Sequence, residues 1–81
     1  MTWTQNQVKD DLAKLITEAM YMEPGEIQDD QLFSDFGLES VTLVKVVEKI
    51  CTKYSCSIEI KELLPHQTLN EASNFIHEKL L

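Results

Sequence analysis

The sequence predicts an all-α fold: a small bundle of three longer helices and one short helix, with a long first loop. Three observations lead to this prediction. Apolar residues recur at helical spacing in three stretches. Residues that favour helix N-termini precede those stretches. The chain has 81 residues, of which 43% are hydrophobic, and this suffices for one small core. We therefore expect residues 1–81 to form a single domain.

The first helix is predicted from about Gln5 to Met22. Thr4 followed by Gln7 fits a capping box, and Trp3 is placed to pack on the start of the apolar face as a hydrophobic staple. Pro24-Gly25 is expected to end the helix. Met20, Tyr21 and Met22 are interpreted as core filler and loop packing. The apolar face comprises Val8, Leu12, Leu15, Ile16, Ala19 and Met20.

The connection from about Glu23 to Glu39 is long for a small domain, so we expect it to be tied to the core or to be functional. Asp29-Asp30 is a candidate cap for a single turn over Gln31 to Ser34. The apolar residues expected to tie the connection down are Ile27, Leu32, Phe33, Phe36 and Leu38.

The second helix is predicted from Ser40 to Lys53 or Tyr54. Its β-branched residues would also suit a strand, but its length and the spacing of its apolar residues favour a helix. Ser55-Cys56-Ser57 is expected to end it. The predicted core stripe is Leu43, Val46, Val47, Ile50 and Tyr54, and the apolar line beside it is Val41, Val44 and Cys51.

The remaining chain predicts a short helical piece over about Glu59 to Leu64, closed by Pro65, and a last helix from about Leu69 to Leu80. Thr68 and Glu71 form a second capping box before that helix. Its inward residues are Leu69, Ala72, Phe75, Ile76 and Leu80.

Charge and composition exclude several classes of function. The chain has fourteen acidic and seven basic residues, with no arginine, so its net charge is −7. A chain with this charge should repel nucleic acid. Such a charge favours basic protein partners; the alternative is that it only keeps the protein soluble. No signal peptide or membrane-spanning run is present, and two cysteines are too few for a disulfide framework. We expect a cytoplasmic monomer that does not bind membranes.

The junction at Ser40 is the candidate functional site. A hydroxyl at a helix N-terminus, where backbone N–H groups and the dipole favour negative charge, suits an attached phosphodiester. Gly37 allows a sharp turn before it, and Leu38 and Val41 flank it with apolar surface. The alternative is that Ser40 is an ordinary N-cap residue.

Three stretches resemble the acyl carrier protein family. Gly37-Leu38-Glu39-Ser40-Val41 is similar to its Gly-x-Asp-Ser-[Leu/Ile/Met] signature, and residues 32–37 resemble the approach to that signature. Leu63-Leu64-Pro65-His66-Gln67-Thr68-Leu69 resembles the stretch before the last helix of polyketide-synthase carriers. Chain length, acidity and helix order agree along essentially the whole chain, and the likeness to the polyketide type is greater than to the fatty-acid type.

The resemblance implies a carrier that performs no chemistry itself. A phosphopantetheinyl transferase would attach 4′-phosphopantetheine from coenzyme A to Ser40 in a Mg²⁺-dependent reaction, and the arm's thiol would hold an acyl group as a thioester. Ketosynthases, acyltransferases or other acyl-processing enzymes would dock on the second helix and the loop before it. Val44, Val47 and Leu64 are candidates to shelter the acyl chain. The expected partner-recognition residues are Asp35, Gly37, Leu38, Glu39, Val41, Val44, Lys45 and Glu48.

Three positions depart from the family pattern. Glu39 replaces the usual aspartate, which could impair a transferase that reads this carboxylate; it is also simply an acidic first-turn residue. Lys45 replaces a common glutamate and begins a basic line with Lys49 and Lys53. That line is either a solvated face or a sign of altered partner choice. Val46 stands where carriers that accept β-branching often have tryptophan, so that role is not indicated.

Rival interpretations remain open. One is a peptidyl, D-alanyl or fatty-acid carrier, although Glu39 differs from the histidine usual in peptidyl members. Another is an unmodified acidic helical adaptor. An enzyme would require a reactive thiolate at Cys51 or Cys56. A zinc site built from these cysteines with His66 and His77 is disfavoured, because the spacings match no familiar finger.

Overall fold

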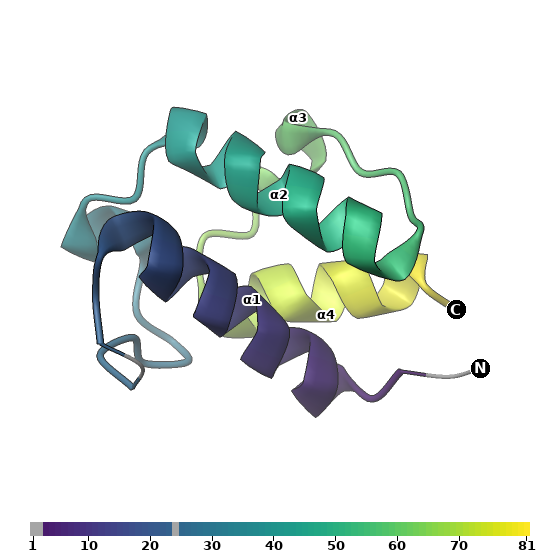
Figure 1. The fold of residues 1–81 in the computed structure, drawn as a ribbon, viewed down its shortest axis with the longest axis horizontal. Coiled ribbons are helices and arrows are strands. Elements are labelled where there is room, and N and C mark those ends of the chain that lie inside the picture. Colours follow the sequence, from purple (N-terminus) through teal and green to yellow (C-terminus); the bar gives the residue numbers. More distant parts are fainter. Residues whose placement is uncertain (1–2, 24) are drawn as a thin grey trace.

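A computed structural model describes residues 3–23 and 25–81 and confirms the all-α bundle. The chain forms α1 (Gln5–Met20), a 3₁₀ turn η1 (Phe33–Phe36), α2 (Ser40–Tyr54), α3 (Ile60–Leu63) and α4 (Leu69–Lys79). Helix α1 packs against both α2 and α4, and α3 packs against α2. The start of α1 and the end of α4 lie at one end of the bundle, and the first loop and the start of α2 lie at the other (Figure 1). Within the described ranges no helix combines the length and apolarity needed to cross a membrane.

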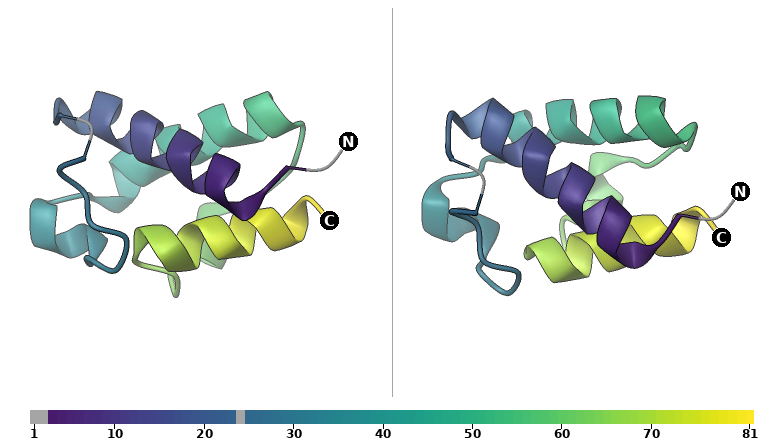
Figure 2. Two further views of the ribbon diagram at one scale, coloured as in Figure 1. Left: turned by 90° about the horizontal axis from the view of Figure 1, so that it is seen from below. Right: turned by 60° about the horizontal axis from the view of Figure 1, so that its bottom comes forward.

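One core fills the space between the three long helices, which stay side by side in the two further views (Figure 2). The predicted core stripe of α2 is confirmed, because all five of its residues are buried. Helix α1 contributes Val8, Leu12 and Ile16, and α4 contributes Leu69, Ala72 and Ile76. Helical periodicity therefore locates the core correctly.

The predicted helix starts of α1 and α4 are confirmed. The Thr4 hydroxyl accepts a hydrogen bond from the Gln7 N–H at 3.1 Å, and the Gln7 side chain accepts one from the Thr4 N–H at 2.8 Å. The Thr68 hydroxyl accepts from the Glu71 N–H at 3.1 Å. Both helices thus begin with a side chain that satisfies a backbone donor. The full capping box forms only at α1, because the structure shows no return bond from the Glu71 side chain to the Thr68 N–H.

Helix α1 ends earlier than predicted. Its last residue is Met20, and Tyr21 turns the chain in the left-handed conformation at φ 55°. The Met22 N–H closes the turn on the Thr17 carbonyl at 2.9 Å. The prediction that the helix runs to Met22 was wrong, because Tyr21 itself adopts the left-handed conformation that ends the helix before Pro24-Gly25 is reached. Pro24 lies outside the described residues. The Tyr21 side chain is 97% exposed, so its assignment to packing was also wrong, whereas Met20 and Met22 do pack on the core.

The first loop is tied to the core by four of the five predicted residues. Ile27, Phe33 and Leu38 are buried, and Phe36 is half-buried against the core. The prediction was wrong for Leu32, which is 49% exposed. The predicted turn over Gln31 to Ser34 is instead η1, which has no side-chain cap. The proposed capping role for Asp29-Asp30 was wrong, since the Asp29 carboxylate pairs with Lys9 Nζ at 2.8 Å.

Candidate functional site

Ser40 is the first residue of α2, and its side chain is exposed at the end of the bundle opposite the end of α4. Glu39 occupies the N-cap position, with φ −92° and ψ 161°, and its carbonyl accepts the Leu43 N–H at 2.9 Å. The alternative that Ser40 is the N-cap was therefore wrong. Its hydroxyl lies inside the first turn and is not used for capping.

The N-terminus of α2 lacks the side-chain cap that α1 and α4 possess. No Glu39 side-chain hydrogen bond caps the first turn of α2, whereas threonines cap α1 and α4. The first N–H groups of a helix have no intrahelical acceptor, and the dipole adds positive potential there. An anionic group on Ser40 would therefore meet N–H donors that no side-chain cap occupies.

Gly37 turns the chain from η1 into α2. It is left-handed, with φ 80° and ψ 20°, and its N–H bonds to the Ser34 carbonyl at 3.2 Å. The Leu38 N–H follows with a 3.0 Å bond to the Phe33 carbonyl. A Cβ atom at Gly37 would meet nothing within 4 Å, so the backbone conformation, and not space, favours glycine here.

The loop before Ser40 is held by the segment before α4. The Phe33 N–H bonds to the Gln67 carbonyl at 2.8 Å, and Leu32 forms an isolated antiparallel bridge with Thr68. The two stretches that carry the family resemblance, residues 32–37 and 63–69, therefore meet at residues 32–33 and 67–68. Sequence reasoning missed this pairing, because exposed Leu32 contributes through its backbone and leaves no periodic signal.

The predicted recognition residues differ in accessibility. Val41 is 70% exposed, Val44 is half-buried, and Leu38 is only 8% exposed, so the Leu38 side chain anchors the loop in the core. The remaining members of the set are exposed: Asp35, Gly37, Glu39, Lys45 and Glu48. Val41, Lys45 and Glu48 follow one another at helical spacing and share one face of α2.

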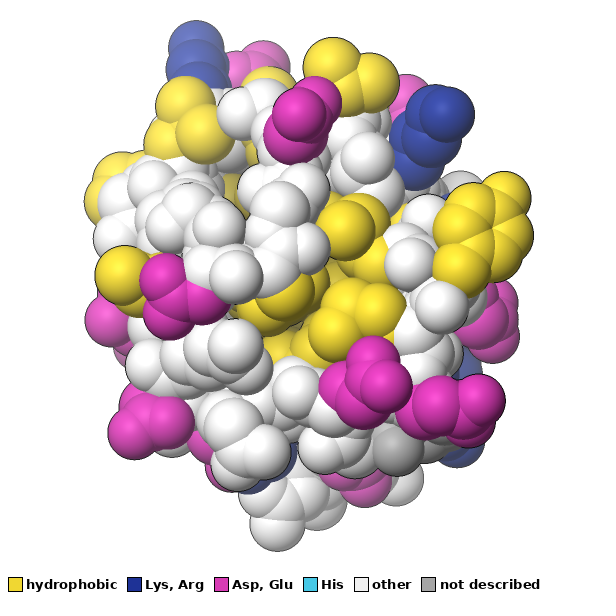
Figure 3. Space-filling view, turned by 90° about the vertical axis from the view of Figure 1, so that its left-hand side faces the viewer, with side chains coloured by type: hydrophobic (Ala, Val, Ile, Leu, Met, Phe, Trp, Pro, Cys, Tyr) yellow, Lys and Arg dark blue, Asp and Glu magenta, His cyan; other side chains and the backbone are white. Residues whose placement is uncertain are grey.

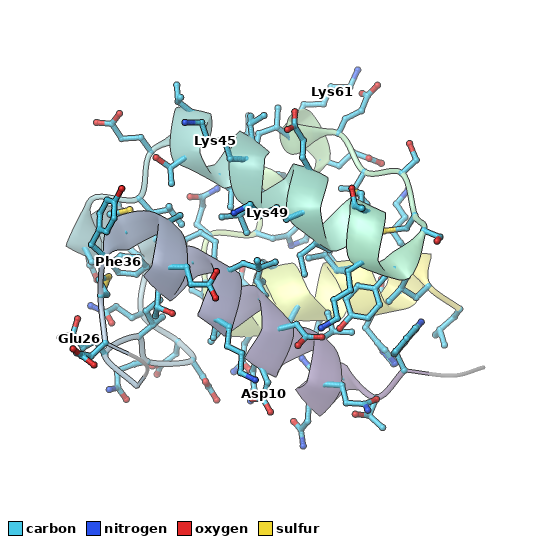
Figure 4. The ribbon with its side chains drawn as sticks, in the orientation of Figure 1. Asp10, Glu26, Phe36, Lys45, Lys49 and Lys61 are labelled. Carbon is cyan, nitrogen blue, oxygen red and sulfur yellow. The ribbon has the colours of Figure 1, made fainter. Side chains whose placement is uncertain are left out.

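The end of the molecule that bears the start of α2 has an apolar, hollowed face. Figure 3 shows hydrophobic side chains gathered around a depression, with acidic side chains around them and basic side chains toward the upper edge. Phe36 lies at this end (Figure 4) and is half-buried. The start of α2 thus lies at the same end of the molecule as an apolar surface rimmed by charge.

The predicted basic line lies on the exposed side of α2. In Figure 4 Lys45 points toward the serine end, and Lys49 points from α2 toward α1. Lys53 is engaged differently, because its Nζ pairs with Asp11 at 3.0 Å. The line therefore consists of two lysines near the site and one that links α2 to α1.

A polar cluster that sequence reasoning missed joins the other ends of α1 and α2. The Tyr54 hydroxyl donates a hydrogen bond to Asp11, and Trp3 packs edge-on to the Tyr54 ring with centroids 4.7 Å apart. Burial and then the Asp11 carboxylate raise the pKa of Tyr54. Burial would raise the pKa of Asp11, but hydrogen bonds from Tyr54 and Lys53 outweigh it and lower that pKa. The aspartate is therefore held ionised.

The cysteines and histidines offer little support for the rival chemistries. Burial, followed by a hydrogen bond with the Cys51 thiol, raises the pKa of Cys56 to about 11, so this thiol stays protonated at neutral pH. His66 stacks on Phe75, and His77 Nε2 lies 2.8 Å from the Trp3 carbonyl oxygen. No group of three metal-ligating side chains occurs in the described part of the chain.

Comparison with known proteins identifies a family. Residues 10–76 match the family described as phosphopantetheine attachment site. Polyketide synthase PksL of Bacillus subtilis is 25% identical over 79 residues, covering 98% of this chain and 2% of PksL. Polyketide synthase ThaG of Burkholderia thailandensis is 28% identical over 69 residues, covering 85% of this chain and 1% of ThaG. The chain thus spans a very small part of these relatives.

Two solved structures share the fold. The NMR structure of the HMG-ACPI domain from the CurA module of Lyngbya majuscula gives a TM-score of 0.84 at 32% identity, covering 95% of this chain and 78% of that one. A free-standing peptidyl carrier protein from Acinetobacter baumannii gives a TM-score of 0.88 at 22% identity, covering 95% and 96%. At that identity the second likeness concerns the fold alone.

Proposed function

Since the chain belongs to the phosphopantetheine attachment site family, we propose that Ser40 is its attachment residue and that the domain presents acyl groups to polyketide-synthase enzymes. Domains of this family carry 4′-phosphopantetheine and are not catalytic themselves. When attached, the group supplies a terminal thiol on which an acyl chain is held as a thioester. The relatives that match are polyketide synthases, which favours the polyketide type.

The observation that carries this proposal is the exposed Ser40 hydroxyl on the first turn of a helix without a side-chain cap. The N–H groups of that turn and the helix dipole would stabilise a phosphodiester on Ser40. Gly37 fixes the direction from which the chain enters the turn, and buried Leu38 holds it in place. The chain therefore contributes attachment, charge stabilisation and orientation.

Recognition by partners would use the exposed residues around Ser40. A phosphopantetheinyl transferase must reach the Ser40 hydroxyl, and Glu39 and Val41 are its exposed sequence neighbours. Ketosynthases and acyltransferases would meet the face of α2 that bears Lys45 and Glu48. A tethered acyl group is present at high local concentration for an enzyme docked there, so encounter is effectively intramolecular.

The rival carrier classes are less well supported. The peptidyl carrier shares the fold at an identity that carries no functional argument. The expectation from Val46, that this is not a β-branching acceptor, stays a prediction; Val46 itself is buried in the core. Sheltering of the acyl chain by Val44, Val47 and Leu64 also stays a prediction.

The test is the intact mass after incubation with coenzyme A, Mg²⁺ and a broad-specificity phosphopantetheinyl transferase. We expect one phosphopantetheinyl group on the wild type and none on Ser40→Ala. Ser57→Ala is the matched control, because Ser57 is exposed and lies beyond the end of α2. It should gain the same mass as the wild type.

Failure of the wild type to gain mass, with folding confirmed by circular dichroism, would be followed by Glu39→Asp. If the transferase modified Glu39→Asp but not the wild type, the failure would be assigned to poor recognition of the longer Glu39 side chain by the transferase. Absence of modification in both proteins would favour the unmodified adaptor and contradict the attachment proposal.

A further inference from the structure

Two adjoining hollows, which share Leu15, Glu18 and Lys49, lie along the outside of the α1–α2 pair, starting near the serine end. The first hollow, about 560 Å³, lies between the two helices and is lined by residues that include Tyr21 and Lys45. The second hollow, about 300 Å³, continues toward Lys14 and Lys53. We refer to the two hollows together as the α1–α2 groove.

The α1–α2 groove gathers most of the positive charge of an acidic protein. Four of the seven lysines line it, against three of the fourteen carboxylates. The other three lysines are set against eleven carboxylates on the rest of the molecule. The lysines that line the groove are Lys14, Lys45, Lys49 and Lys53, and the carboxylates are Asp11, Glu18 and Glu48.

Much of this positive charge is free for a partner. Within residues 3–23 and 25–81, the only ion pair that involves a groove lysine is Lys53 with Asp11. Asp11 also accepts the Tyr54 hydroxyl, so one of the three groove carboxylates is already engaged inside the protein. Lys49 points from α2 toward α1, where an occupant of the groove would lie (Figure 4).

The groove also offers an apolar contact at the serine end. Leu15, Ala19 and Val46 line its floor, and the Tyr21 ring stands at its mouth with 97% of its surface exposed. A tyrosine exposed to this extent gains little inside the domain, and aromatic residues are typical anchors of protein interfaces. The left-handed C-cap at Tyr21 holds the base of this side chain in place.

We propose that the α1–α2 groove docks an acidic segment of a partner protein, with its carboxylates facing Lys45 and Lys49 and an apolar side chain against Tyr21. The excess of lysines over carboxylates in the groove favours an acidic occupant. A nucleic acid is disfavoured, because the acidic remainder of the molecule would repel a phosphate polymer. The inference rests on the proposed function in one respect: the occupant is expected to belong to a synthase enzyme that works on the carried group.

The experiment selects peptides from a displayed library of random 14-residue sequences on immobilised Ser40→Ala protein. This variant cannot carry the arm at Ser40, so the groove is tested independently of attachment. We expect the enriched peptides to contain more Asp and Glu than Lys and Arg, together with an aromatic or large aliphatic residue. Amide chemical shifts on titration of the best peptide should change along the groove.

Two single charge reversals provide the comparison. Lys49→Glu should lower the affinity for the selected acidic peptide about tenfold, because the attraction between Lys49 and the peptide carboxylates becomes a repulsion. Lys61→Glu makes the same charge change on α3, where the side chain is 77% exposed and forms a surface ion pair with Glu59. It should change the affinity for the peptide less than about twofold. Tyr21→Ala should weaken binding without changing the charge preference.

Three results would overturn the proposal. They are the absence of enriched peptides, enrichment of neutral or basic peptides, and equal weakening by Lys49→Glu and Lys61→Glu. A dimer of the wild type that Lys49→Glu dissociates would instead make a second copy of this chain the occupant. Loss of Ser40 attachment in the mass assay would contradict the proposed function while leaving the peptide result unchanged.

Discussion

At the scale of single residues, Gly37 has the most direct influence on where Ser40 lies. Its φ of 80° is a left-handed conformation that costs a residue with a Cβ atom about 1–2 kcal/mol. We expect Gly37→Ala to lower the free energy of unfolding by about that amount and to slow attachment of the arm to Ser40. Urea denaturation and the time course of the mass gain would measure the two effects.

Gly25 is the matched control for this prediction. It has φ 95°, and a Cβ atom there would also meet nothing within 4 Å. Gly25→Ala should therefore destabilise the protein to a similar extent while leaving the attachment rate unchanged. If the two variants slow attachment equally, the position of Gly37 next to the site has no special role.

Glu39 is an N-cap residue that makes no capping hydrogen bond. Aspartate is a far better N-cap because its shorter side chain reaches the N–H groups of the first turn. We expect Glu39→Asp to raise the free energy of unfolding by about 0.5–1 kcal/mol, measured by urea denaturation. An unchanged or lower value would show that the backbone at Glu39 does not allow the cap to form.

At the scale of elements, α1 and α2 are joined by the hydrogen bond from Tyr54 to Asp11. Tyr54→Phe keeps the ring against Trp3 and removes only the hydroxyl, so it should lower the free energy of unfolding by about 1 kcal/mol. Tyr21→Phe removes the hydroxyl of a fully exposed ring and should change stability by less than about 0.5 kcal/mol. Thermal unfolding of the two variants would make the comparison.

The same cluster predicts a dependence of stability on pH. The folded pKa of Asp11 lies below its ordinary value of 3.8, so its contribution is complete above that value and is lost as pH falls through the folded pKa. Asp11→Asn should be less stable than the wild type near pH 7, and the difference should shrink toward pH 2. Asp10→Asn, which removes the exposed neighbouring carboxylate, is the matched control and should change stability near pH 7 by less than about 0.5 kcal/mol. Urea midpoints across the acid range would test both.

The sequence predicts the helical elements well and the turns between them poorly. Helical periodicity and threonine caps are local signals, so the starts of α1 and α4 and the whole of α2 follow from them. The end of α1 does not, because Tyr21 adopts a left-handed conformation that its residue type does not favour. The Asp11–Tyr54 contact is equally hidden, since it joins two helices whose relative placement depends on the completed core.

At the scale of the whole molecule, charge is unevenly distributed. Outside the α1–α2 groove there are eleven carboxylates and only three lysines. These carboxylates repel one another in the compact state. We expect stability to rise when NaCl increases from about 0.02 M to about 0.5 M, because salt screens this repulsion. Thermal midpoints at the two concentrations would check it. A lower midpoint at high salt would mean that the ion pairs of the surface outweigh the repulsion.

The candidate site illustrates which features escape sequence reasoning. Ser40, Gly37 and the start of α2 are adjacent in the chain, and turn chemistry together with the family resemblance located them. The loop before Ser40 is also supported by Gln67 and Thr68, which are distant in the sequence. Their contacts use backbone atoms, and backbone atoms leave no residue-specific pattern in the sequence. The gathering of lysines in the α1–α2 groove likewise emerges only when Lys14 of α1 is placed beside the basic line of α2.

The bridge between Leu32 and Thr68 also has a consequence for the order of folding. The loop that presents Ser40 lacks two of its backbone partners until the segment that leads into the last helix has docked, and such long-range contacts form late. On the ribosome, Ser40 emerges well before Gln67 and Thr68. We therefore expect an incomplete chain to present its serine poorly, so that a transferase modifies finished domains in preference to nascent ones.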